Sequence, residues 1–142
     1  MQRIFSTLLV AGLSIFLIGC GEKNHGTTAV TIKVTQKGAP LARAIVTAIS
    51  SDGNSASGTT NDAGVTTLQT TQGWAGALPG EYKIAIKKWE NYTVPAPSED
   101  DPKATSTEQK NILPAKYGEH ATSGFSLTVG SKAAEATFDI AE

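Results

Sequence analysis

Only one cysteine, Cys20, and only two histidines occur among the 142 residues of this sequence. A chain with one cysteine has no internal disulfide, so packing and backbone pairing alone must stabilise the fold. His25 and His120 are a small supply of groups that exchange protons near neutral pH. A Gly-x-Ser-x-Gly nucleophile motif is also missing. We therefore expect a protein that is not an enzyme and needs no cofactor.

An excess of charge of either sign is also lacking. Twelve basic residues balance thirteen acidic ones, for a net charge of -1, and no basic stripe interleaved with aromatic residues is present. Proteins that follow a phosphate backbone need such a stripe, so we expect no nucleic-acid partner. Apolar residues at helical spacing are absent beyond the first twenty residues, which leaves strands as the main elements.

The N-terminus has the features of a bacterial lipoprotein signal. Arg3 precedes an apolar stretch from Ile4 to Ile18, and Leu17-Ile18-Gly19-Cys20 ends it. This stretch is shorter than the roughly 20 residues that cross a bilayer, which favours a cleaved signal over an uncleaved anchor. An ordinary cleaved secretory signal is the other alternative. We expect residues 1–19 to be removed.

The position of Cys20 indicates its use. The resemblance to bacterial lipoproteins implies a diacylglyceryl thioether on Cys20 and further acylation, for example by palmitate, which together hold a protein firmly on its membrane. Residues 20–28 are short and polar, as in a flexible tether. In the sorting rule of some Gram-negative bacteria, an aspartate after the lipidated cysteine retains a lipoprotein in the inner membrane. Gly21 stands at that position, which slightly favours the outer membrane of the cell envelope. The domain is expected outside the cytoplasm.

Residues 29–142 suit a single domain built from short strands. Apolar and polar residues alternate, as expected for strands with one buried face, in the segments Val30 to Val34, Tyr82 to Lys87, Phe125 to Val129 and Ala136 to Ile140. The segment Ala44 to Ile49 is apolar on both phases and predicts a strand covered on both sides. Six or seven such strands predict an all-β fold, an antiparallel β-sandwich of Greek-key type, with a partly closed barrel as the alternative. Residues 90–107, with three prolines, predict a long mobile loop.

Three motifs together resemble one family. Gly38-Ala39-Pro40-Leu41-Ala42-Arg43-Ala44, Thr59-Thr60-Asn61-Asp62-Ala63-Gly64 and Leu78-Pro79-Gly80-Glu81-Tyr82-Lys83-Ile84 resemble the carboxypeptidase regulatory-like domains, whose fold is a transthyretin-like (prealbumin-like) sandwich of seven strands. The run Leu113 to Gly118 is similar to a subgroup of short bacterial lipoproteins built on that domain. Arg43 stands where the family usually has glycine. The resemblance implies a structural or binding module.

Four aromatic side chains are candidates for a ligand platform, since exposed rings stack on sugars or anchor protein partners. They are Trp74, Trp89, Tyr92 and Tyr117. The alternative is that these rings fill the core or its edge. Two loops offer oxygen atoms for Ca²⁺, from Asp52, Asn54, Asn61 and Asp62. Turns use the same residue types for their backbone, so we expect no metal site. Tyr117 and His120 are too few ligands for an iron centre.

We therefore expect a membrane-anchored, non-catalytic lipoprotein that is a structural or protein-interaction module of the bacterial cell envelope. Its partners would be the membrane, through the lipid on Cys20, and an envelope protein or glycan. The alternative is a carbohydrate- or solute-binding lipoprotein that uses the aromatic loops, and a small hydrolase or metal enzyme is a weaker one.

Overall fold

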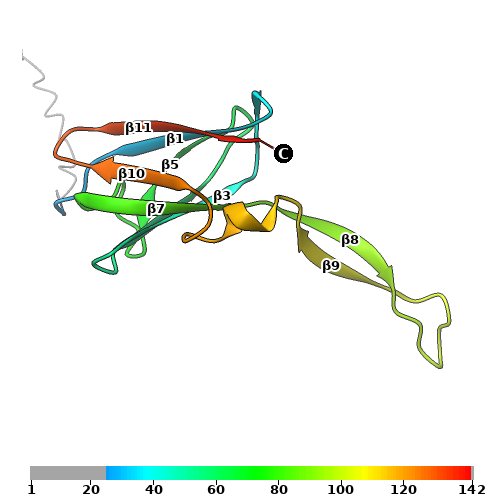
Figure 1. The fold of residues 1–142 in the computed structure, drawn as a ribbon. Helices are drawn as coiled ribbons and strands as arrows, with labels where there is room; N and C mark the ends of the chain where they lie inside the picture. Colours follow the sequence, from blue (N-terminus) through cyan, green and yellow to red (C-terminus); the bar gives the residue numbers. More distant parts are fainter. Residues whose placement is uncertain (1–24, 142) are drawn as a thin grey trace, which may run out of the picture.

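The computed structural model describes residues 25–141, which form an all-β protein of antiparallel sheets in which one strand pair is parallel. Two sheets make up a body, and a separate two-stranded ribbon projects from it (Figure 1). Within residues 25–141 the only helical element is a 3-10 turn, η1 (Ala115–Gly118). No helix in this part of the chain has the length and apolarity to cross a membrane.

The first sheet is centred on β1 (Val30–Gln36). Its neighbour β11 (Ala134–Ile140) runs parallel to it, with Val30 opposite Ala134 and Gln36 opposite Ile140. The expectation of purely antiparallel pairing is wrong for this pair of first and last strands, while the other strand pairs of the described residues are antiparallel. The other edge of β1 pairs with β2 (Ala39–Pro40) and β5 (Val65–Thr67).

The second sheet has five strands in the order β10-β7-β3-β4-β6. Their bounds are β10 (Phe125–Val129), β7 (Gly80–Lys87), β3 (Ile45–Ser50), β4 (Ser55–Thr59) and β6 (Gln69–Thr70). The long central strand β7 pairs with β3 on one side and with β10 on the other.

One hydrophobic core joins the two sheets. The alternating residues of β1 and β7 supply its centre, and all of them are buried, as the sequence predicts: Val30, Ile32, Val34, Tyr82, Ile84 and Ile86. Phe138 and Ile140 of β11 belong to the same cluster, and Phe125 and Leu127 of β10 pack against it half-buried.

Strand β3 differs from its prediction. Ala44, Val46 and Ala48 face the core, but Ile45 and Ile49 on the other phase are each 39% exposed. A strand that is apolar on both phases is therefore not covered on both sides here. The apolar side chains on its outer face are half open to solvent, which is common for isolated aliphatic residues.

The segment predicted as a loop is instead largely paired. Strands β8 (Trp89–Pro95) and β9 (Thr105–Asn111) form an antiparallel hairpin that contains most of residues 90–107. The prediction is wrong because it required alternating apolar residues, whereas threonine-rich polar strands are held by backbone pairing and by the β-propensity of threonine. Pro97 and Pro102 lie in the turn between the strands, where they block no ladder hydrogen bond.

A carboxylate fixes the hairpin turn between β1 and β2. Asp139 Oδ1 accepts hydrogen bonds from Thr35 Oγ1 at 2.5 Å and from the Gly38 amide at 3.1 Å. These two donors hold the pKa of Asp139 below its ordinary value. A carboxyl whose pKa is lower in the folded than in the unfolded state stabilises the fold above its unfolded pKa, and this stabilisation is lost as the pH falls through the folded pKa.

We expect a carboxyl-carbon NMR titration to show Asp139 titrating below the ordinary 3.8 of an aspartate. In a Thr35→Val variant the pKa should rise toward that value, because the first and larger of the two contributions is removed. The free energy of unfolding of the variant should also depend less on pH between about pH 5 and pH 2. An ordinary pKa in the unmodified protein would contradict the hydrogen-bonded geometry.

Candidate functional site

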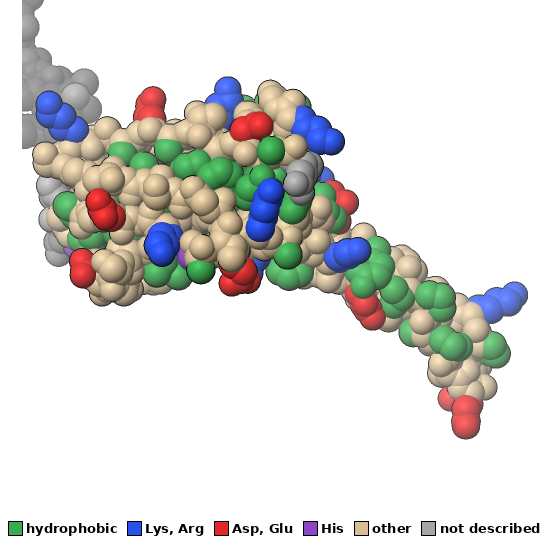
Figure 2. Space-filling view, in the orientation of Figure 1, with side chains coloured by type: hydrophobic (Ala, Val, Ile, Leu, Met, Phe, Trp, Pro, Cys, Tyr) green, Lys and Arg blue, Asp and Glu red, His purple; other side chains and the backbone are tan. Residues whose placement is uncertain are grey.

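The hairpin is the most unusual surface of the protein. We call Trp89–Asn111 the arm; it extends from the body without contributing any side chain to the core cluster. Figure 2 shows it as a narrow extension in which polar, charged and hydrophobic side chains alternate. Isolated two-stranded hairpins are at best marginally stable in water, so an arm of this length suggests a use beyond folding.

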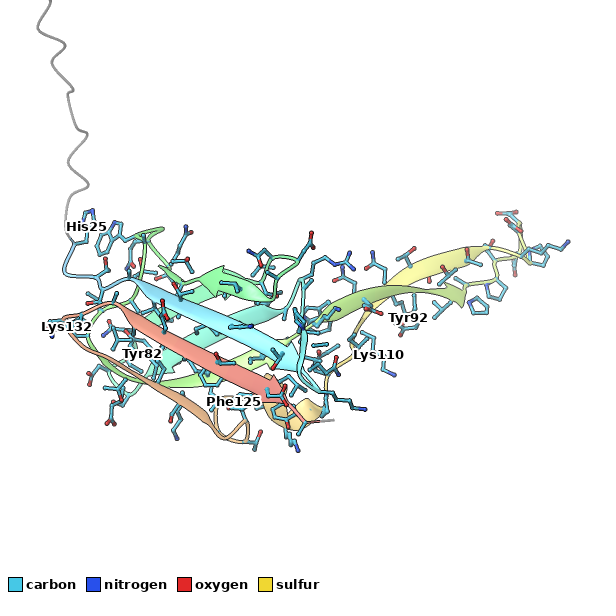
Figure 3. The ribbon with its side chains drawn as sticks, turned by 90° about the horizontal axis from the view of Figure 1, so that it is seen from above. His25, Tyr82, Tyr92, Lys110, Phe125 and Lys132 are labelled. Atoms are coloured by element: carbon cyan, nitrogen blue, oxygen red, sulfur yellow. The ribbon has the colours of Figure 1, made fainter. Side chains whose placement is uncertain are left out.

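The arm and the first described residue, His25, lie at opposite ends of the body. His25, the first described residue, is at one end in Figure 3, and Tyr92 of the arm is beyond the other end. Figure 1 shows the same arrangement from the side. An attachment made before residue 25 would therefore leave the arm pointing away from the point of attachment.

Side chains across the arm hold its two strands in register. The Tyr92 hydroxyl donates a hydrogen bond to Glu108 Oε2 at 2.7 Å, and Gln109 Nε2 donates to Asn91 Oδ1 at 3.1 Å. The bond to the Glu108 carboxylate raises the pKa of the Tyr92 phenol, since it favours the protonated form. These cross-strand pairs give the arm a defined shape without burial.

The base of the arm is joined to the body by one amide side chain. Asn111 Oδ1 accepts hydrogen bonds from the Lys88 amide at 3.0 Å and from the Leu113 amide at 3.3 Å. Leu113 is buried in the core cluster. The end of β9 is thus hydrogen-bonded to the backbone of a residue whose side chain lies in the core, which helps to fix the direction in which the arm leaves the body.

The four candidate aromatic residues lie in different parts of the structure and do not share one face. Trp74 is half-buried at the tether end, where its ring stacks on His25 with centroids 4.0 Å apart. Tyr117, in η1, is only 5% exposed and stacks on Phe125. Trp89 and Tyr92 are 46% and 41% exposed on the arm. An odd and an even position of one strand point to opposite faces, so these two rings do not face one ligand together.

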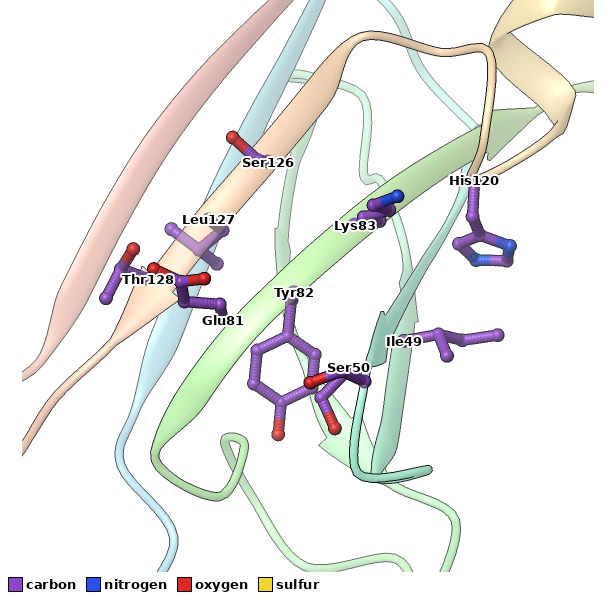
Figure 4. Close-up of a pocket in the computed structure, with 10 residues that line it drawn as sticks. Ile49, Ser50, Glu81, Tyr82, Lys83, His120, Ser126, Leu127 and Thr128 are labelled. Atoms are coloured by element: carbon purple, nitrogen blue, oxygen red, sulfur yellow. The ribbon is translucent and has the colours of Figure 1, made fainter.

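A hollow of about 420 Å³ lies beside the outer face of the second sheet. Strands β3, β7 and β10 and the connection after η1 form its wall (Figure 4), which includes Glu81, Lys83 and His120. His120 Nε2 is buried without a hydrogen-bond partner among the described residues. Tyr82 lies at the hollow, and its hydroxyl donates to the Leu78 carbonyl; burial and, to a lesser extent, nearby Asp52 raise its pKa.

The other residues named in the sequence analysis either have structural roles or lie outside the described residues. Asn61 Oδ1 accepts hydrogen bonds from the amides of Ala63 and Val65, as an asparagine does in a turn. Within residues 25–141 no three His, Cys, Asp or Glu side chains gather in a way that would hold a metal ion. Arg43, where the resembled family usually has glycine, has a positive φ of 57°. Cys20 and the signal segment lie outside the described residues.

The arm is the structural element that the sequence did not predict. Its signal in the sequence is the run of β-formers Tyr92-Thr93-Val94 followed by Pro95, and the similar threonine run of β9. No protein-family model matches the sequence, and no curated protein matches it.

Proposed function

We propose that this protein is a membrane-anchored, non-catalytic lipoprotein of the bacterial cell envelope whose arm binds a protein partner. Lipid on Cys20 would hold the tether end, and the arm would present its strands at the far end of the body. The observation that carries the proposal is the position of the arm, which lies opposite His25 and contributes no side chain to the core cluster. A surface that is costly to keep ordered and is directed away from its anchor is suited to contact.

We also propose that the body is a Greek-key β-sandwich of the transthyretin-like, carboxypeptidase regulatory-like type. Two sheets that share one core and pair mainly antiparallel support this assignment, together with the three sequence motifs. In such a domain the body would be the scaffold, and the inserted arm would determine which partner is bound. Function then depends on the arm more than on the fold.

The glycan-binding alternative has less support from the geometry. Stacking platforms for sugars need exposed rings that share a face, and the exposed Trp89 and Tyr92 point to opposite faces of the ribbon. Trp74 and Tyr117 are engaged with His25 and Phe125. A protein partner that contacts the backbone edges of the arm does not need convergent rings.

Shortening the arm tests the proposal. Residues 93–107 are replaced by Asn-Gly, so that Tyr92 and Glu108, which are opposite each other in the ladder, flank a two-residue turn. Both lipidated full chains, the unmodified-length one carrying Lys103→Ala so that the two have the same amines, are cross-linked in their native membranes with an amine-reactive reagent. Every cross-linked product is detected by its mass, whatever its composition. We expect the unmodified-length chain to give a discrete species and the shortened chain to lose it, while both remain in the membrane.

Two controls make the result interpretable. A Cys20→Ala variant should leave the membrane fraction, which tests the anchor separately from the arm. The shortened chain should unfold at nearly the same temperature as the unmodified one, because the removed residues pack against no core side chain. If the shortened chain keeps every cross-linked species, the arm is not the binding element.

A further inference from the structure

The two edges of the arm differ in what they offer a further strand. The amide of Ile112 donates to the Lys88 carbonyl, and the amide of Ala96 donates to the Ala104 carbonyl. Antiparallel ladders alternate between such pairs and pairs whose backbone groups point outward. Even-numbered residues of the arm therefore bond each other, and the odd-numbered residues direct their amides and carbonyls away from the ribbon.

Proline interrupts one of these edges at the end of its strand. On β8 the outward positions are Trp89, Asn91, Thr93 and Pro95, and Pro95 has no amide to donate. On β9 the outward positions are Thr105, Thr107, Gln109 and Asn111, and all of them keep their amides. In the part of the chain that the structure describes, no third strand pairs with either edge. The β9 edge is thus the one that is open to a further strand.

The body offers less free edge than the arm does. Strand β10 contacts β11, so these two borders of the body sheets lie against each other, and β6, the opposite border of the second sheet, is the short strand Gln69–Thr70. Long unpaired strand edges normally lead to association, and proteins usually cover them or interrupt them with proline or charge. The β9 edge contains no proline, and its two charged residues, Glu108 and Lys110, have opposite signs, so they do not repel a second copy of the same edge.

We propose that the β9 edges of two copies of this chain pair with each other, antiparallel, about a two-fold axis at Thr107. This inference rests on the proposed role of the arm in binding and names the partner as a second copy. Each copy contributes the same surface, as an isologous interface requires. The two hairpins become one four-stranded sheet, which removes the weakness of an isolated two-stranded ribbon.

This register suits the side chains. Thr107 lies opposite Thr107 of the second copy, and Thr105 opposite Gln109. Glu108 lies opposite a serine, Ser106, and Lys110 opposite Ala104. Cross-strand threonine pairs are favourable in antiparallel sheets, and no like charges meet. Moving the axis by one residue to Glu108 would place two glutamates opposite each other, and moving it to Ser106 would pair only residues 105–107 of β9 with their counterparts. Charge and the bounds of β9 together therefore select the threonine-centred register.

A pair of single-cysteine substitutions distinguishes the two edges. Thr107 and Thr93 lie opposite each other in the arm, both are exposed, and both direct their amides outward, but to different edges. In the proposed pair the two positions 107 are about 5.5 Å apart, within disulfide range, whereas the two positions 93 are about 14 Å apart across three strand spacings. The chain with native Cys20 alone is the background control.

The full chain in its native membranes is oxidised and separated under non-reducing conditions. We expect Thr107→Cys to give a disulfide dimer at least tenfold above the background and Thr93→Cys to give none. If Thr107→Cys is joined to a different protein, self-pairing is wrong while the arm's role in binding stands. If neither substitution is cross-linked, both the self-pairing and the proposed use of this edge are overturned.

Proline and charge substitutions test the backbone bonds and the register. Thr107→Pro removes the central amide donors and should abolish the dimer, measured by light scattering on the detergent-solubilised full chain, whereas Thr93→Pro should keep it. Position 106 of each copy lies opposite Glu108 of the other, so Ser106→Lys creates two pairs of opposite charge. It should strengthen dimerisation roughly two- to tenfold. Ser106→Glu should weaken it by a similar factor. Effects of the same sign for both substitutions would exclude this register.

Discussion

Replacing Tyr117 by alanine is expected to reduce the free energy of unfolding by about 3–5 kcal/mol, the cost of removing a large buried aromatic side chain. Tyr117 is 5% exposed, and its ring stacks on Phe125 with centroids 5.4 Å apart. Phe125 in turn contacts Phe138, with centroids 4.8 Å apart. The Tyr117 hydroxyl also accepts a hydrogen bond from the Ala141 amide at 3.3 Å. Thermal and urea unfolding of the purified protein measure the change.

Tyr92→Ala is the matched control for this prediction. It removes the same side chain from the exposed arm, and we expect the free energy of unfolding to stay almost unchanged, because Tyr92 contacts no residue of the core cluster. The pair separates the two interpretations of the aromatic residues, core and platform. A large loss of stability from Tyr92→Ala, or almost none from Tyr117→Ala, would mean that the rings are placed incorrectly.

The core strands could be predicted from the sequence because their signal is local. Alternation of Val30, Ile32 and Val34 with polar residues identifies the buried face of β1, and the same pattern identifies Tyr82, Ile84 and Ile86 in β7. Burial of one face makes a period of two visible in the sequence. The parallel pairing of β1 with β11 has no such signal, because their contact joins the two ends of the chain.

The arm could not be predicted in this way. Its strands bury neither face, so polar residues occupy both phases and the pattern resembles that of a loop. The prolines that indicate a break lie at the end of β8 and in the turn, where a hairpin tolerates them. The same property that concealed the arm, the absence of a buried face, leaves its backbone edges as the groups available for binding.

Which aromatic residues are buried and which are exposed also could not be predicted from the sequence. Trp89, Tyr92 and Tyr117 all lie near turns or prolines in the sequence, yet only Tyr117 reaches the core, through the 3-10 turn η1. Its burial depends on how η1 is placed against β7 and β10, which is a property of the assembled sheets. A ring near a turn can face either way until the neighbouring strands are positioned.

Gly76→Ala is expected to cost about 3–5 kcal/mol or to prevent folding, because two independent penalties combine. Gly76 has a positive φ of 90°, which side chains rarely adopt, and a Cβ atom there would lie 2.1 Å from the Thr28 carbonyl oxygen. That carbonyl accepts the Ala77 amide at 2.9 Å, and the Thr28 amide donates to the Ala77 carbonyl at 2.8 Å. The clash is with backbone, which has no alternative rotamer, so these bonds at the tether end of the body would be lost.

Gly73→Ala isolates the conformational part of this cost. Gly73 has a similar positive φ of 83°, but a Cβ atom there would meet nothing within 4 Å. We expect it to reduce the free energy of unfolding by only about 1 kcal/mol, measured in the same unfolding experiments. Equal effects at the two glycines would contradict the close approach of residue 76 to Thr28. A larger effect at Gly76 would support the close approach of residue 76 to Thr28, through which the start of the described chain is held against the body.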